Sequence, residues 1–291
     1  MGGYSMPMRA LALTALLLGS AACRTPRPEA GAAARADLSV ATCELPSSPA
    51  ELIPLAEAPI PGELHERFDL PDGPAWWAPA PEDAERQRYR EALVARLGAG
   101  GVEARALLAR SREQFAAQAL PLRREAENNA RVLEGGAGTV GPTSCLEWRL
   151  FQRQARRFPM LEHPTEFSAY VLRGQGRLHV YFSGADRAGA KLRSEVTERV
   201  AAEVARGFVL VAHAHNHNFM FDRVPGDRLW TTPETVNVVG GGVAPSLTDV
   251  QAYRGMHEAL GLQGAWVTNG LETGRYTAGD FTRLSAWEPV P

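Results

Sequence analysis

The feature that most constrains the fold of this chain is a run of histidines that directly follows a short apolar segment. Residues 208–212 carry no charge and are mainly β-branched or aromatic, which is typical of a buried strand. Three of the seven histidines follow at alternate positions, as His213, His215 and His217. Because side chains alternate between the two faces of a strand, these imidazoles are expected on one side. Two of them could bind one metal ion; the alternative is that all three are solvated, or bond one another and the backbone.

A hydrolytic zinc site usually has three protein ligands and one open position for water, so further candidates are needed. Asp249 belongs to Ser246-Leu247-Thr248-Asp249, at the start of a predicted helix. This pattern is also that of a capping box, in which Ser246 and Asp249 only cap the helix. Glu166 directly precedes a predicted strand, where a glutamate is commonly just solvated.

Taken together, these pieces resemble the JAMM (MPN-plus) metalloprotease family. Its pattern is an upstream Glu, then H-x-H-P, then S-x-x-D. Here Glu166 opens the matching segment, His213-Ala214-His215 matches H-x-H, and Pro245 leads Ser246-x-x-Asp249. The resemblance covers residues 161–284, under half of the chain.

The resemblance implies a site and a reaction. His213, His215 and Asp249 would hold Zn²⁺, and Glu166 would act as general base and then general acid. Ser246 would donate a hydrogen bond to the developing oxyanion. The implied reaction is hydrolysis of a peptide or isopeptide bond, with a peptide or protein as substrate.

Two departures from the family pattern leave other functions open. Asn216 stands in place of the proline, and His215 and Asp249 are 34 positions apart, with an insertion over residues 219–243. A non-catalytic JAMM-like binding or envelope-structural lipoprotein is therefore an alternative. A histidine-triad nucleotide hydrolase or transferase is another, although that family has apolar residues between its histidines and would give Glu166 and Asp249 no role.

The N-terminus predicts export. Arg9 precedes an apolar run over residues 10–18, which is too short to span a bilayer, and small residues then lead to Cys23. This arrangement resembles a bacterial lipobox, although Ser20 stands where leucine is usual. We therefore expect a signal peptide over 1–22 and lipid on Cys23, which would attach the protein to a membrane at the periplasmic or extracellular face of the cell envelope.

The remaining cysteines and the charge fit an exported protein. Cys43 and Cys145 are an even pair and could form a disulfide in an oxidising compartment, or could be two buried thiols. The net charge is −2, the pI is about 6.4 and no basic block occurs, so nucleic acid is not an expected partner.

Periodicity predicts the remaining organisation. An Ala- and Pro-rich tether is expected over 23–62 and a helical accessory region over 63–158. The predicted metallohydrolase domain, 159–291, has a hairpin (167–172 and 178–182), a helix over 191–206, the histidine strand, a helix from Ser246, and strands near 264–267, 275–277 and 281–284. The expected fold class is α/β or α+β; the resemblance implies a JAMM/MPN-like mixed sheet flanked by helices.

Overall fold

The computed structural model describes residues 43–120, 122–189, 193–222, 228 and 240–288, all within one compact unit that spans Ser39–Pro291. The predicted signal peptide over 1–22 and the predicted lipidation site Cys23 lie outside these residues. No helix among the described residues combines the length and the apolar character needed to cross a membrane.

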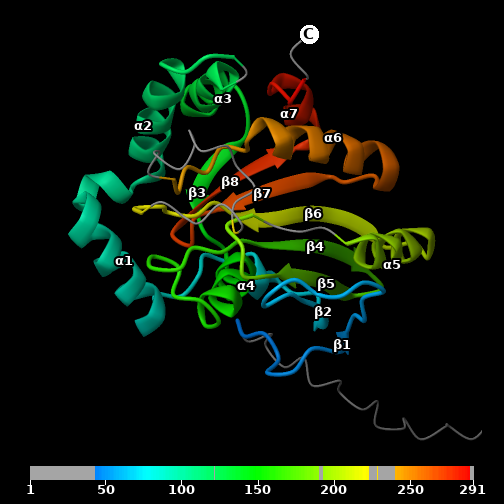
Figure 1. The fold of residues 1–291 in the computed structure, drawn as a ribbon. Coiled ribbons are helices and arrows are strands. Elements are labelled where there is room, and N and C mark those ends of the chain that lie inside the picture. The colour runs from blue at the N-terminus through cyan, green and yellow to red at the C-terminus, as the bar shows by residue number, and fades with distance from the viewer. Residues whose placement is uncertain (1–42, 121, 190–192, 223–227, 229–239, 289–291) are drawn as a thin grey trace, which may run out of the picture. The chain divides into compact units, whose positions relative to one another are not determined.

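The unit is a mixed α/β structure built on one eight-stranded sheet (Figure 1). The order of the described strands is β1-β2-β5-β4-β6-β7-β8-β3, and among them only β6 and β7 pair in parallel. The strands are β1 (Glu51–Leu52), β2 (Leu64–Pro71), β3 (Thr139–Pro142), β4 (Phe167–Gly174), β5 (Arg177–Gly184), β6 (Val209–Asn216), β7 (Gly264–Thr268) and β8 (Glu272–Thr277).

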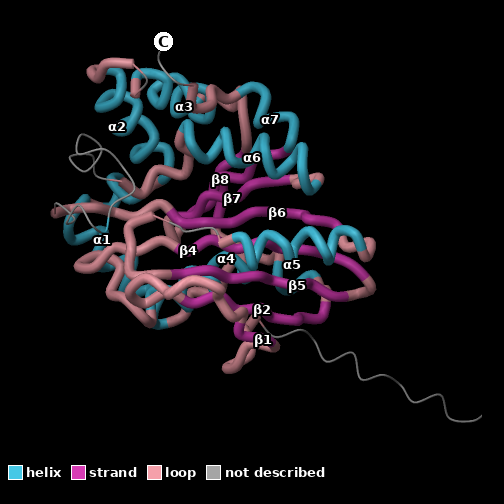
Figure 2. Tube along the Cα trace, turned by 45° about the vertical axis from the view of Figure 1, so that its right-hand side comes forward, coloured by secondary structure: helices cyan, strands magenta, loops and turns pink. Residues whose placement is uncertain are grey.

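Seven α-helices accompany the sheet in the described part of the chain. They are α1 (Ala84–Leu97), α2 (Ala104–Ala116), α3 (Arg123–Leu133), α4 (Cys145–Ala155), α5 (Ser194–Ala205), α6 (Leu247–Leu260) and α7 (Ala278–Arg283). Helices α5 and α6 pack through Val200 and Tyr253 on the sheet face that carries Tyr170. Helix α4 packs through Trp148 on the opposite face; Figure 2 shows α5 in front of the sheet.

The predicted hairpin and histidine strand are confirmed, and local chemistry explains them. Strands β4 and β5 are joined by Gln175 and Gly176, with φ of 54° and 72°, and positive φ at both positions is what a two-residue hairpin turn of type I′ needs. Strand β6 runs from Val209 through His213 and His215, between β4 and β7. The histidines therefore lie on a central strand.

One expectation about secondary structure holds in part and another was wrong. The region 63–158 contains the helices α1–α4, as predicted, but it also supplies β2 and β3, which pair with β5 and β8 of the main sheet. Residues 281–284 do not form a strand, because α7 begins at Ala278. There the Asp280 carboxylate accepts the Thr277 backbone N–H at 2.8 Å and caps the helix.

The predicted disulfide between Cys43 and Cys145 is present, and it joins the first described residue to the start of α4. It closes a loop across a sequence separation of 102 residues, so it removes much conformational freedom from the unfolded chain. Reduction is expected to lower the free energy of unfolding by about 2–4 kcal/mol. Urea denaturation with and without dithiothreitol measures this. The Cys43→Ser/Cys145→Ala variant should not respond to dithiothreitol, and an unchanged midpoint in the wild type would contradict the expectation.

Candidate metal centre

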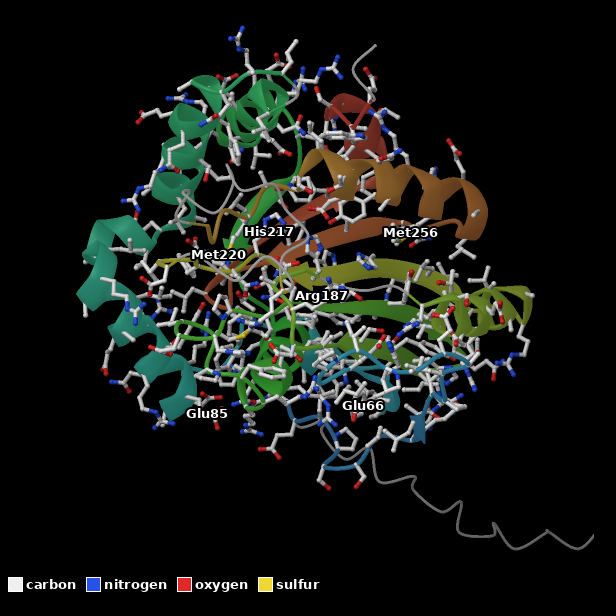
Figure 3. All side chains as sticks on the ribbon, viewed as in Figure 1. Glu66, Glu85, Arg187, His217, Met220 and Met256 are labelled. Carbon is white, nitrogen blue, oxygen red and sulfur yellow. A yellow bond between two sulfur atoms is a disulfide. The ribbon has the colours of Figure 1, made fainter. Side chains whose placement is uncertain are left out.

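Three side chains that could hold a metal ion meet at the end of β6. His215 is the second-last residue of β6, His217 follows just after the strand, and Asp249 lies in the first turn of α6. Figure 3 shows His217 between the end of β6 and the N-terminal end of α6. Among the described residues, His215, His217 and Asp249 are the only group of three or more His, Cys, Asp or Glu side chains whose ligand atoms all lie this close together.

The three ligand atoms form a nearly equilateral triangle. Nε2 of His215 lies 3.2 Å from Nε2 of His217, and Oδ2 of Asp249 lies 3.4 Å from the first and 3.2 Å from the second. Tetrahedral zinc with bonds of about 2.0–2.1 Å places its ligand atoms about 3.3–3.4 Å apart. The triangle therefore has the size that such an ion requires.

Each imidazole is oriented through its other nitrogen. His217 Nδ1 lies 2.8 Å from the carbonyl oxygen of Gly242, and because a carbonyl only accepts, this nitrogen carries the proton. His215 Nδ1 lies 3.1 Å from the hydroxyl of Tyr253, which can accept its proton. Ligating histidines usually have such a partner, because it fixes the tautomer and leaves the Nε2 lone pair for the metal.

Ser246 holds the Asp249 carboxylate in place. The Ser246 backbone N–H and hydroxyl donate to Asp249 Oδ2 at 2.8 and 2.7 Å, and the Asp249 N–H donates to Ser246 Oγ at 3.1 Å. Ser246 Oγ also lies 2.9 Å from Thr248 Oγ1, and either hydroxyl could be the donor in this contact. The capping box is therefore present, and it orients a candidate metal ligand at the same time.

The predicted ligand His213 does not belong to this group. It is only 5% exposed, its ring meets Tyr170 edge to face at 5.1 Å, and neither ring nitrogen has a hydrogen-bond partner among the described residues. Burial and the charge of His215 lower the pKa of His213 to about 3, so its ring is neutral. The H-x-H pair that reaches Asp249 is His215-Asn216-His217, two residues later than predicted.

Glu166 lies close to the group. Asn218 Nδ2 donates to Glu166 Oε1 at 3.5 Å, and the charge of Glu166 contributes to raising the pKa of His217. Asn216, fully buried, ties this segment to β6: its Oδ1 accepts the Phe167 N–H at 2.8 Å. Its amide group also donates to the carbonyl of Thr165 and to Asn218 Oδ1. The two asparagines thus connect Glu166 to the histidines.

Sequence reasoning missed two further residues of the site, Tyr253 and Glu125. Tyr253 stands four positions after Asp249 on α6, and this helical spacing was a usable signal. Glu125 comes from α3, and its Oε1 accepts the Leu247 N–H at 2.8 Å, 122 positions along the chain. Burial raises the pKa of Glu125 to about 7. Nothing local in the sequence marks Glu125.

The electrostatics show how a proton and a metal would compete for the group. Burial raises the pKa of the Asp249 carboxyl, but the charges and hydrogen bonds of His215 and His217 outweigh it and hold that pKa well below its ordinary value. Burial lowers the pKa of His217, whereas the Asp249 carboxylate, Glu166 and the Gly242 carbonyl raise it to about 9. In the metal-free protein His217 and Asp249 are therefore an ion pair.

Metal affinity is expected to increase with pH, because the ion replaces the proton on His217 Nε2. With a pKa of about 9 for His217, the apparent affinity should rise about tenfold per pH unit from pH 7 and level off above about 9. In the metal-free fold, the raised pKa gives stability that is complete below about pH 6.5 and is lost as the pH rises through about 9. Competition with a chelator across this range measures the affinity; a flat profile would contradict the ion pair.

The chain matches no protein-family model, no curated protein and no solved structure. A function can therefore be inferred only from the site and from the order of its residues along the chain.

The insertion over residues 219–243 lies largely outside the described residues, apart from 219–222, 228 and 240–243.

Proposed function

We propose that this protein is a zinc-dependent peptidase or isopeptidase of the JAMM type. The observation that carries the proposal is the triangle of His215, His217 and Asp249, with both imidazoles fixed through their Nδ1 atoms. Two histidines, one carboxylate and an open position are a usual donor set for hydrolytic zinc. The order of segments along the chain, Glu then H-x-H then S-x-x-D, agrees with the family pattern once H-x-H is assigned to His215 and His217, two residues later. Asn218 then stands where the family has proline.

Each residue of the site has a role in the proposed reaction. His215, His217 and Asp249 would hold the ion, which supplies Lewis acidity and activates water when it is bound. Glu166 would accept the proton of the attacking water on its carboxylate and return it to the leaving amine. Ser246 would keep Asp249 in place; its role as an oxyanion donor stays a prediction, since its hydroxyl now bonds Asp249 and Thr248.

We also propose that the protein is a lipoprotein of the bacterial cell envelope, anchored through Cys23. The disulfide between Cys43 and Cys145 supports export, since such bonds persist in oxidising compartments. Of the three cysteines in the sequence, Cys23 is then the one outside the disulfide. A lipidated Cys23 carries lipid through amide and thioether links, and the mass that this lipid adds would be measured in the intact mass of the mature protein.

Metal analysis of the purified protein tests the proposed function. The wild type is expected to retain about one zinc per chain, and Asp249→Ala should retain less than about a tenth of that after dialysis, because two imidazoles alone bind weakly. Asp222→Ala, a change of the same kind at an exposed aspartate, is the matched control. A wild type that keeps no zinc would refute the proposal, and zinc without hydrolysis of a broad peptide library would favour the non-catalytic alternative.

A further inference from the structure

A polar cavity lies away from the metal centre, between α3, α6, α7 and the segment that follows α7. Its volume is about 360 Å³, and it is lined by four arginines with a single carboxylate. We call it the arginine pocket; the residues that matter here are Arg124, Arg131, Arg254, Arg283, Ser285 and Glu288. Four guanidinium groups around one small cavity repel one another unless anions balance them.

The carboxylates around the arginine pocket balance these charges only in part. Glu288, itself largely exposed, pairs with Arg124 at 2.8 Å, and Asp280 pairs with Arg283 from outside the pocket lining. Asp280 is also committed to the backbone N–H groups of Gly138 and Thr277. Glu127 lies 3.9 Å from Arg131, at the limit of an ion pair. Arg254 has no carboxylate partner among the described residues.

Two of the arginines are held in place by neutral groups. Arg254 donates from Nε and Nη2 to the carbonyls of Phe281 and Leu284, at 2.8 and 2.7 Å. Arg131 donates from Nη1 to Ser285 Oγ at 3.1 Å. A guanidinium group has five N–H donors, so both arginines keep donors for a ligand.

The wall of the arginine pocket is also fixed. Asn128, which is fully buried on α3, donates to the carbonyl of Ser285 at 2.8 Å and accepts the Ser285 N–H at 2.8 Å. This reciprocal pair fastens the segment after α7 to α3. A ligand would therefore meet a site whose shape already exists, which reduces the ordering cost of binding.

We propose that the arginine pocket binds a small phosphate-bearing anion, which displaces Glu288 from Arg124. Glu288 provides one carboxylate, tethered near the end of the chain, and a phosphate group brings more charge and three acceptor oxygens to the same donors. Planar guanidinium groups match a phosphate by paired N–H···O bonds. The ligand could be the headgroup of an anionic lipid or a soluble phosphate ester, which share this chemistry.

Calorimetry with two probes tests the proposal, on the full chain carrying Cys23→Ser so that no lipid anchor contributes. The probes are glycerol 3-phosphate in solution, and phosphatidylcholine vesicles with and without phosphatidylglycerol. Saturable binding of the soluble probe would identify a soluble ester as sufficient. Binding only to vesicles that contain phosphatidylglycerol would identify a lipid headgroup. Binding of neither probe would overturn the proposal.

Variants show whether binding occurs in the arginine pocket. Arg131→Gln/Arg283→Gln should weaken binding about 100-fold, about tenfold for each charged donor lost. Glu288→Gln should strengthen it several-fold, because the internal competitor is removed. Arg156→Gln, at an exposed arginine paired with Glu85, is the matched control and should change nothing. Equal weakening by the control and the double variant, with the fold verified by circular dichroism, would overturn the assignment.

Discussion

Replacing Glu166 by glutamine is expected to leave the metal in place and to lower the rate of peptide hydrolysis by about 10²–10⁴-fold. The carboxylate is not one of the three converging ligands, and it lies within reach of Asn218 and close enough to His217 to raise the pKa of that histidine. A glutamine keeps the shape and the hydrogen bond but cannot take a proton. Zinc content and single-turnover hydrolysis of a peptide library, measured on the same preparation, separate the two effects.

Glu162→Gln is the matched control for this change. Glu162 lies four positions earlier, is largely exposed and pairs with Arg96 at 3.1 Å, so its loss should not affect turnover. Full activity in Glu166→Gln would remove Glu166 from the mechanism. Loss of zinc in that variant would mean that Glu166 acts as a ligand.

His217→Ala is expected to weaken metal binding, whereas His213→Ala is expected to leave it unchanged. His217 provides one corner of the triangle, and its loss should weaken zinc binding by more than about 100-fold, beyond the 10–100-fold typical of outer-shell changes. The ring nitrogens of His213 have no hydrogen-bond partner among the described residues, and the ring packs edge to face against Tyr170, so His213→Ala should keep the metal. It should cost about 1–3 kcal/mol of stability, since it leaves a cavity at a buried position.

This pair of variants distinguishes the two possible histidine pairs directly, by zinc titration with a chromophoric chelator and by thermal unfolding. His257→Ala is the control, because His257 is an exposed histidine on α6 that is not one of the three converging ligands; its ring bonds the carbonyl of Leu262 and meets Phe281 edge to face at 6.4 Å. Loss of zinc in His213→Ala with retention in His217→Ala would reverse the ligand assignment.

The local elements of the site could be predicted from the sequence, but which side chains converge could not. Alternation along β6 placed the imidazoles on one side, and the capping box marked the start of α6 at Ser246. The choice between His213 and His217 depends on where β6 ends relative to α6, because Asp249 reaches only His215, near the end of the strand, and His217, just after it. The 30 residues between β6 and α6 show no regular sequence periodicity, so the sequence does not indicate where α6 lies along β6.

The parts of the fold that the sequence did not reveal are long-range. Strand β2 pairs with β5 although more than 100 residues separate them, and β3 completes the far edge of the sheet against β8. Strand β3 has only four residues, too few to show a clear period of two. Glu125 and the arginine pocket likewise combine α3 with segments more than 100 positions later.

X-ray absorption at the metal edge of the purified zinc-loaded protein tests the central claim most directly. We expect scattering from two imidazoles and from oxygen ligands at about 2.0–2.1 Å, with no sulfur, and one imidazole fewer in His217→Ala. Three imidazoles in the wild type, or a spectrum that His217→Ala leaves unchanged, would contradict a site made of His215, His217 and Asp249.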